Sequence, residues 1–283
     1  MKLLSFGEIL FDVFTDNSHI GGAPLNFAAH AAKQGADAWI VSAVGNDKLG
    51  ENALNQLKNW NINSEFVKVL PDKQTGKCLV TLDENSIPTY DLLTDVAYDY
   101  IPLPDINGRF DILYFGTLSL RGEYNIHTVK SLLDKKICKE VFVDINIRPP
   151  FYSVATVNFA LQSATIVKIS DEELPVIMET AFEQRNIDVN NAINTIAARF
   201  KNLKLIILTR GANGSTAFDV STGKIYNCAA TATNVVSTVG AGDSFSATFI
   251  TNYWRGSPII ECLKAASDIS ALVVSREEAV PEY

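Results

Sequence analysis

Residues 237–249, with the sequence STVGAGDSFSATF, have the types and spacing that best suit chemistry. Gly240 and Gly242 permit backbone conformations and close approaches that a side chain would prevent, and the small and apolar residues after them predict a buried helix. Backbone N–H groups at such a helix start favour a bound anion. Asp243 could take a proton from an attacking hydroxyl while these amides hold the charge on a transferred phosphoryl group. The alternative is that Asp243 only stabilises the start of its own helix.

A second loop, residues 21–26 (GGAPLN), could bind a ligand rich in hydroxyl groups. Gly22 and Pro24 predict a tight loop that leads into a helix, with exposed amides that donate hydrogen bonds. The Asn26 side chain can both donate and accept. Asp12, just after the first predicted strand, would add a carboxylate acceptor for sugar hydroxyls. The alternative for the glycine pair is a plain turn.

Two further segments place polar residues or glycines directly after predicted strands. Thr209 is followed by Gly211 and Gly214, and glycines three apart can form a turn that accommodates the phosphates or base of a nucleotide. A simple hairpin turn is the alternative. Asn146 and Arg148 follow another strand, and ligands of open α/β sheets bind at the carboxyl ends of strands.

The elements that must position these residues alternate between strand and helix. Short apolar runs predict strands at 3–6, 38–44, 112–115, 141–145, 166–169 and 205–209, and helical periodicity lies at 26–34, 51–60, 125–133 and 187–200. This alternation predicts a mostly parallel sheet covered on both faces. There is no low-complexity linker or internal repeat, so residues 1–283 are expected to form one domain.

One region interrupts the alternation. Residues 75–99 are strand-like, with a predicted turn at 83–86, and residues 11–20 have a similar extended character. Together they are expected to form a small β lid over a site at the sheet edge. The alternative is a surface hairpin without that role.

Composition excludes several classes of function. The 283 residues include 24 Lys and Arg against 32 Asp and Glu, for a net charge of −8, and no basic block, which argues against nucleic acid or an anionic membrane as partner. No apolar run is long enough to span a membrane. The four scattered cysteines suggest neither a zinc site nor a disulfide framework, and with no signal-peptide pattern at the start a cytoplasmic location is expected. Signatures of P-loop NTPases, Rossmann dehydrogenases, α/β-hydrolases and protein kinases are missing from the sequence.

Taken together, the motifs resemble the ribokinase-like (PfkB) family of carbohydrate kinases, and among them the bacterial fructokinases most. The likeness runs in order along nearly the whole chain, through residues 7–14, 21–50, 75–76, 144–148, 209–214 and 240–243. It implies a three-layer α/β/α sandwich with a mostly parallel central sheet and a small β-strand lid. It also implies transfer of the γ-phosphoryl group of ATP to a sugar hydroxyl with Mg²⁺.

The resemblance further implies roles for individual residues, grouped by what they bind. The implied set comprises the catalytic base Asp243, the anion hole of Gly240, Ala241 and Gly242, the sugar-binding residues Asp12, Gly22, Asn26, Asn146 and Arg148, the nucleotide-binding residues Thr209, Gly211, Gly214 and Ser267, and Glu173 as the residue that organises the metal.

Four positions depart from the family pattern on the nucleotide side. Ser170 replaces the Asn of an Asn-x-x-Glu motif that organises Mg²⁺ and phosphates, and Ser237 replaces an Asp of a monovalent-cation site. Ser267 stands where an Asn often faces the nucleotide, and Glu278 stands in place of a Gly. These departures leave K⁺ activation and the strength of ATP binding open.

The sequence therefore predicts an ATP-dependent sugar kinase that forms fructose 6-phosphate from fructose. Two alternatives stay open: a kinase for another small polyol, such as ribose, a nucleoside or a keto-deoxy sugar acid, and a non-catalytic sugar-binding protein on the same scaffold. The expected partners are the sugar, ATP and a second copy of the chain, because open strand edges of a lid can pair with another chain.

Overall fold

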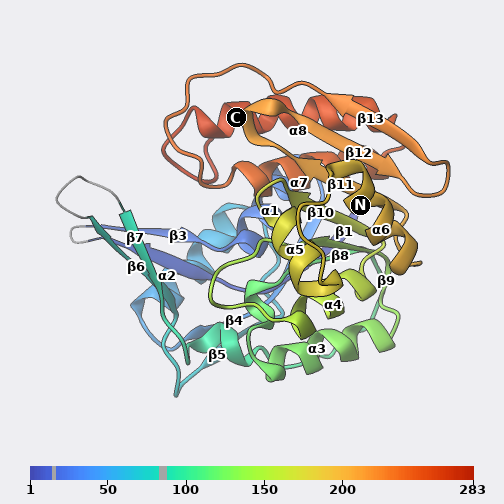
Figure 1. Ribbon diagram of the computed structural model, residues 1–283. Helices are drawn as coiled ribbons and strands as arrows, with labels where there is room; N and C mark the ends of the chain where they lie inside the picture. The colour runs from blue at the N-terminus through green and yellow to red at the C-terminus, as the bar shows by residue number, and fades with distance from the viewer. Residues whose placement is uncertain (15–16, 83–87) are drawn as a thin grey trace.

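The computed structural model describes residues 1–14, 17–82 and 88–283, and its centre is a nine-stranded sheet. The strand order is β13-β12-β11-β10-β9-β8-β1-β4-β5 (Figure 1). The strands are β1 (Lys2–Phe6), β4 (Asp37–Gly45), β5 (Val67–Leu70), β8 (Phe110–Gly116), β9 (Cys138–Asp144), β10 (Ile166–Ser170), β11 (Leu205–Thr209), β12 (Ser215–Asp219) and β13 (Lys224–Cys228).

Strands β5 to β11 of this order pair in parallel, and β12 and β13 pair antiparallel at one edge. The six strands expected from apolar runs are confirmed as β1, β4, β8, β9, β10 and β11. The pattern identified them because a parallel strand buried on both faces is apolar along most of its length. The antiparallel pair β12–β13 was not predicted. Its outer strand (KIYNC) lies at the sheet edge with mostly exposed residues, so it carries no continuous apolar run.

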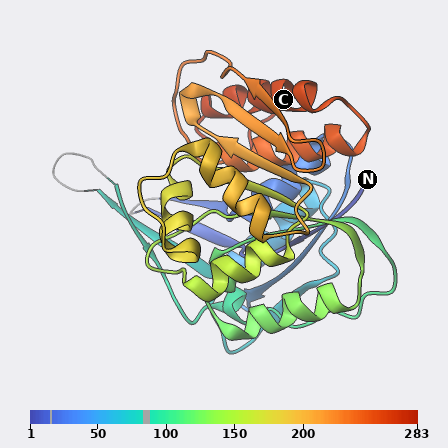
Figure 2. The same ribbon diagram turned by 45° about the vertical axis from the view of Figure 1, so that its right-hand side comes forward.

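Helices cover both faces of the sheet and complete three layers (Figure 2). They are α1 (Ala23–Lys33), α2 (Lys48–Asn59), α3 (Glu123–Asp134), α4 (Val154–Ser163), α5 (Glu173–Phe182), α6 (Val189–Arg199), α7 (Ala241–Trp254) and α8 (Ile259–Val274), with 3₁₀ helices η1 (Ala97–Tyr100), η2 (Leu118–Leu120) and η3 (Gly211–Asn213). One apolar core includes residues of α3 to α6 and the other residues of α1, α2, α7 and α8. Adjacent residues of β1 divide between them: Leu4 packs in the first core and Leu3 in the second, as strand alternation requires. None of the helices in the described ranges is long and apolar enough to cross a membrane.

A second, four-stranded sheet extends from this body (Figure 1). Its order is β3-β2-β6-β7, with β2 (Leu10–Val13), β3 (Ser18–Gly21), β6 (Gly76–Leu82) and β7 (Pro88–Leu92). The outer pairs are antiparallel and β2 pairs with β6 in parallel. The segments expected to form a small separate sheet therefore do so. The turn predicted at 83–86, and residues 15–16 of the other segment, lie outside the described residues.

Aromatic side chains fix α1 on the sheet next to its polar N-terminal loop. The ring of Phe27 stacks on that of Tyr114 with centroids 3.6 Å apart, and meets Phe142 edge-on at 5.9 Å. All three side chains are fully buried. Because Phe27 follows Asn26 directly, the same contacts that anchor α1 also fix the loop before it.

Replacing Phe27 with Ala should lower the free energy of unfolding by about 3–5 kcal/mol, because it removes a ring from a close-packed cluster and leaves a cavity. Urea denaturation measures the effect. Ile260→Ala is the matched control, since Ile260 lies on the outer surface of α8 and is 41% exposed; its effect should stay within about 0.5 kcal/mol. Equal losses in the two variants would contradict the role assigned to the aromatic cluster.

Candidate active site

The N-termini of α1 and α7 meet, and a hydrogen bond joins their polar side chains. Asn26 Nδ2 donates to Asp243 Oδ2 at 2.9 Å, across 217 positions of sequence. Gly240 precedes α7 with φ of 79°, and a Cβ there would lie 2.4 Å from the carbonyl oxygen of Ala279. Only glycine therefore permits this approach. The two loops singled out in the sequence thus form one site.

The surroundings of Asp243 set its protonation. Burial raises the pKa of Asp243 to about 6, and the charge of Asp144 adds to the rise. The hydrogen bond from Asn26 and the positive charges of Lys168 and Arg148 oppose it. A carboxylate with a pKa near 6 is ionised at neutral pH and is still a useful proton acceptor.

A buried ion pair lies beneath the start of α7. Lys168 Nζ donates to both Asp144 carboxylate oxygens at 2.8 Å, and Ser246 Oγ donates to one of them at 3.1 Å. A Cβ on Gly242 would lie 3.4 Å from Lys168 Nζ, so the cation is close to the backbone of the predicted anion hole. Burial alone would lower the pKa of Lys168, but the negative charges of Asp144 and other carboxylates outweigh this effect and raise the pKa above its ordinary value. The ammonium group therefore stays charged.

Sequence reasoning did not assign a role to Lys168. The available signal was a lysine inside an otherwise apolar strand, IVKIS, whose neighbours are all buried except the last. A charged residue in such a strand requires a partner. The partner, Asp144, ends the neighbouring strand in the sheet, although it is 24 residues away in the chain.

Asp12 and Arg148 are the two charged residues predicted to bind the sugar. Asp12 pairs in register with His19 on β3 and with Cys78 on β6. Burial raises the pKa of Asp12, while a hydrogen bond from the Cys78 thiol and the charges of His19 and Arg148 lower it. The charge of Arg148 also lowers the pKa of Asp243. The Arg148 guanidinium therefore lies within electrostatic reach of both carboxylates.

Sequence reasoning also missed Glu8, a buried carboxylate. Its side chain is 2% exposed, and Oε2 has no hydrogen-bond partner in the part of the chain that the structure describes. Burial raises the pKa of Glu8 to about 7, against hydrogen bonds from its own amide and that of Ala23. A Cβ on Gly22 (φ of 114°) would lie 2.4 Å from the Glu8 carbonyl oxygen, so this close approach requires glycine. The signal was an acidic residue in the apolar stretch SFGEILF.

Glu173 holds together two loops at the carboxyl edge of the sheet. Its Oε1 accepts from the Ile147 amide at 2.7 Å and its Oε2 from the Ser170 amide at 2.8 Å. Ser170 Oγ in turn accepts from the Glu173 amide at 3.2 Å. Asn146, with φ of 44°, lies in the loop that Glu173 fixes.

The donor set around Glu173 is compatible with Mg²⁺ only in part. Among residues 1–14, 17–82 and 88–283, no three His, Cys, Asp or Glu side chains are grouped to hold a metal on their own. Protein Mg²⁺ sites commonly use one or two carboxylates, with substrate phosphates and water supplying the other ligands. The arrangement fits a metal ion that binds together with a nucleotide.

A cavity of about 590 Å³ lies beside the start of α7. It brings together all four predicted nucleotide-binding residues, Thr209, Gly211, Gly214 and Ser267, with Ala241 and Gly242 of the predicted anion hole. Its volume suits a ligand of nucleotide size. A Cβ on Gly214 would lie 2.1 Å from the carbonyl oxygen of Cys228, so glycine is required there too.

Three of the four departures from the family pattern form local hydrogen bonds. Ser267 Oγ accepts from the Thr231 amide at 2.9 Å, and Ser237 Oγ accepts from the Val239 amide at 3.3 Å. Ser170 caps the Glu173 amide as described above. Glu278 is exposed. Of these four residues only Ser267 lines the cavity, and Ser237 precedes Thr238, which also lines it.

Comparisons with known proteins identify a family for this chain and proteins that share its fold. A family model described as pfkB family carbohydrate kinase matches residues 2–282. A putative sugar kinase of Pyrococcus horikoshii is 27% identical over 98% of this chain and 91% of its own length, and fructokinase-2 of Oryza sativa subsp. japonica is 26% identical over 99% and 90%. The fold is shared with a fructokinase from Vibrio cholerae O395 solved with fructose, ADP and calcium ion, at a TM-score of 0.84 and 22% identity over 99% of this chain and 94% of that one. It is also shared with the Pyrococcus sugar kinase solved with ATP, at 0.83 and 24% over 98% and 94%.

The raised pKa of Asp243 makes a prediction about stability. Between its ordinary value of 3.8 and about 6, the folded chain holds a proton that the unfolded chain releases, so the carboxylate lowers stability as pH rises through this window. Asp243→Asn removes that cost and keeps an acceptor for Asn26. The variant should be more stable than the parent by about 1–3 kcal/mol at pH 8, and the difference should vanish near pH 4. Thermal unfolding across pH measures it; a variant that is less stable at both pH values would contradict the assigned burial.

Proposed function

The chain belongs to the pfkB family of carbohydrate kinases, and on that basis we propose that it is an ATP-dependent fructokinase that forms fructose 6-phosphate. The observation that carries the proposal is the hydrogen bond between Asn26 and Asp243. This bond joins the loop suited to sugar hydroxyls to the carboxylate of Asp243. The two residues before Asp243, Ala241 and Gly242, line the cavity of nucleotide size. A sugar hydroxyl and a phosphoryl group could therefore reach the same carboxylate.

In the proposed reaction, Asp243 accepts the proton of the attacking sugar hydroxyl. The sugar oxygen forms a bond to the γ-phosphorus of ATP, and the bond from that phosphorus to the bridging oxygen of ADP breaks. Amides of residues 240–242 donate to the phosphoryl oxygens, and the buried ammonium of Lys168 close beneath them offsets part of their charge. A general base of this kind contributes about 10²–10⁴ in rate.

Asp12, Gly22 and Asn26 would hold the sugar, with Asn146 and Arg148 on the other side. This set can match the hydroxyl groups of a sugar, because Asp12 accepts hydrogen bonds, Arg148 donates them, and the side-chain amides of Asn26 and Asn146 do both. The second sheet carries Asp12 on β2 and would close over the sugar as a lid. Closure excludes water and so limits transfer of the phosphoryl group to water.

Thr209, Gly211, Gly214 and Ser267 would contact the nucleotide, since all four line one cavity. Bound Mg²⁺ would neutralise phosphate charge. Glu173 is the carboxylate that would help to hold it, and the phosphates would supply other ligands. The edge strands of the second sheet are β3 and β7, and their open edges would pair with a second copy of the chain in a homodimer.

A panel of sugars tested with ATP, Mg²⁺ and coupled detection of ADP measures the substrate preference, with and without potassium. Fructose should give the highest kcat/KM, and the product should carry its phosphate on the 6-hydroxyl. Higher turnover on ribose, a nucleoside or a keto-deoxy sugar acid would replace fructose as the substrate and keep the kinase. Sugar binding by calorimetry without any nucleotide binding would instead favour a sugar sensor.

The Asp243→Asn variant tests the proposed base directly. Its kcat should fall by about 10²–10⁴, because an amide cannot take the proton, while sugar binding measured by calorimetry stays within a few-fold of the parent. Asp219→Asn is the control, since Asp219 is a half-buried carboxylate that accepts hydrogen bonds in the turn at the end of β12 and lines neither cavity. Near-parental turnover in the Asp243 variant would show that another group accepts the proton.

A further inference from the structure

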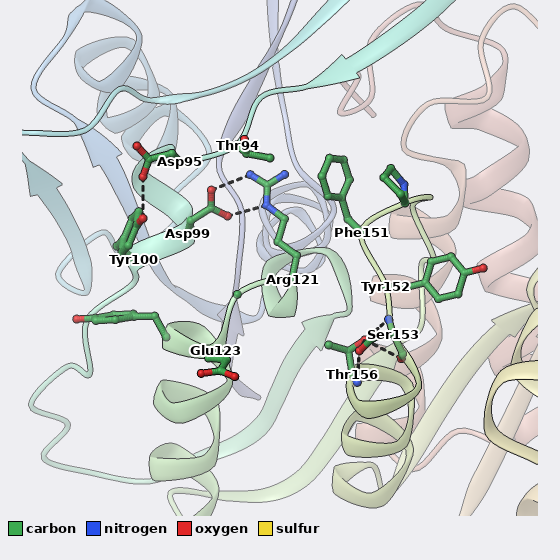
Figure 3. A pocket seen from close by; sticks show the side chains of 13 residues that line it. Thr94, Asp95, Asp99, Tyr100, Arg121, Glu123, Phe151, Tyr152, Ser153 and Thr156 are labelled. Atoms are coloured by element: carbon green, nitrogen blue, oxygen red, sulfur yellow. Dashed lines mark hydrogen bonds and ion pairs between the residues drawn. The ribbon is translucent and has the colours of Figure 1, made fainter.

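A second cavity, of about 550 Å³, shares no lining residue with the cavity beside α7 (Figure 3). It is bordered by three segments: residues 94–100, residues 121–124 at the start of α3, and residues 150–156 at the start of α4. None of the predicted site residues lines it. The cavity is therefore a feature that the reaction described above does not use.

Arg121 and Asp99 form a nearly buried ion pair in the wall of this cavity. Arg121 Nε and Nη2 donate to the two Asp99 oxygens at 2.7 and 2.8 Å, and the two side chains are 7% and 12% exposed. The guanidinium also lies 4.8 Å from the ring centroids of Tyr98 and Phe151. The side chain is thus held at fixed orientation by a carboxylate and two aromatic rings.

Arg121 also bonds the base of the β6–β7 hairpin. Its Nη2 donates to the Leu93 carbonyl oxygen at 2.7 Å. The Leu93 amide in turn donates to the carbonyl oxygen of Lys77 on β6, at 3.0 Å. The guanidinium is therefore attached to the second sheet through one hydrogen bond and one strand pairing.

Phe151, whose ring contacts the Arg121 guanidinium, belongs to the loop that carries Arg148. The Phe151 amide donates to the Arg148 carbonyl oxygen at 2.7 Å, which closes a turn over residues 148–151. In Figure 3 the Phe151 ring lies on the side of the guanidinium that faces away from Asp99. One side chain thus contacts both the hairpin base and the turn of a predicted sugar-binding arginine.

Stability alone does not account for an arginine here. A buried ion pair costs desolvation of both charges, and apolar residues of similar volume often serve stability as well or better. In addition, Arg121 Nη1 is buried without a hydrogen-bond partner in the described part of the chain, which adds a cost. What the planar guanidinium provides is a fixed geometry toward four neighbours at once: Asp99, the Leu93 carbonyl oxygen and the two aromatic rings.

We propose that Arg121 is a positioning residue for phosphoryl transfer: it couples the β6–β7 hairpin to the turn of residues 148–151, so that closing the lid and placing Arg148 against the sugar occur together. The proposal rests on the proposed role of the second sheet as a lid. Without this coupling the sugar would still bind in contact with Asp12 and Asn26. Arg148 and the lid would then move independently, and water would reach the phosphoryl group more often.

The Arg121→Lys variant tests the coupling because it keeps the charge and loses the fork that holds Asp99, Leu93 and both rings. The KM for the sugar should rise about tenfold, and ADP formed without phosphorylated sugar should increase, whereas the KM for ATP should stay unchanged. Arg199→Lys is the matched control. Arg199 lies between the rings of Phe182 and Phe200 and donates to the Ala181 carbonyl, away from the lid.

Chemical rescue separates positioning from a loss of folding. In Arg121→Ala, millimolar methylguanidine added to the assay can enter through the cavity and should restore the parental KM for the sugar; the same addition should not change Arg199→Ala. Hydrogen exchange of residues 76–82 should speed up in Arg121→Lys and not in Arg199→Lys. This measurement needs no turnover, so it tests the coupling even if the parent phosphorylates no sugar in the panel.

Two results would overturn the proposal. One is an Arg121→Lys variant with the parental sugar KM and no uncoupled ADP formation. The other is equal loss of activity and of thermal stability in the Arg121 and Arg199 variants, which would assign Arg121 a purely structural role. Inactivity of the parent chain on every sugar would reject the proposed function instead, and the exchange rates of residues 76–82 would then decide the coupling.

Discussion

The hydrogen bond from Asn26 to Asp243 is the contact on which the site depends, because it brings two helix N-termini together at the carboxyl edge of one parallel sheet. Helices α1 and α7 pack on the same face, in the core that contains Phe27 and Phe249. Gly22 and Gly240, in the loops before them, permit close backbone packing, because a Cβ at either position would lie 2.4 Å from a carbonyl oxygen. Asp243 thus follows directly after Ala241 and Gly242, which line the cavity of nucleotide size, and the proposed phosphoryl transfer depends on a base in this position.

Concentrating this chemistry at one edge also concentrates charge. Glu8 and Asp144 are buried and Asp243 is half-buried, and removal from water raises the pKa of Glu8 to about 7 and that of Asp243 to about 6. Lys168 and Arg148 are the cations that act on them. Asp144 lies 2.8 Å from Lys168, and the two charges have opposite effects on the pKa of Asp243. With a pKa of about 6, Asp243 is ionised at neutral pH and is still an effective proton acceptor. The ionised carboxylate of Asp243 therefore lowers the free energy of unfolding at neutral pH, and the same raised pKa makes it a better proton acceptor.

The sequence alone predicted the parts of this account that depend on local patterns. Apolar runs located six of the seven parallel strands and missed the short, largely exposed edge strand β5, and glycine spacing located the two loops that carry Asn26 and Asp243. Lys168 and Glu8 escaped because a charge inside a strand is explained only by its neighbours in the sheet, and those lie far away in the chain. Arg121 escaped for the same reason: its contacts with Asp99 and Phe151 come from segments 22 and 30 positions away that share no motif. The predicted roles of individual site residues remain predictions, although the four predicted nucleotide-binding residues line one cavity and Asn26 bonds to Asp243.

The pH dependence of kcat/KM for the sugar tests the central claim most directly, because Asp243 must be ionised to accept the proton. The profile of the parent chain should fall about tenfold per pH unit on its acid side, with a midpoint near the pKa of about 6 set by burial of Asp243. In Asp243→Asn the residual rate should lose this acid limb. A parent profile that stays flat down to pH 4.5, or an acid limb at the same midpoint in the variant, would contradict the assignment of Asp243 as the base.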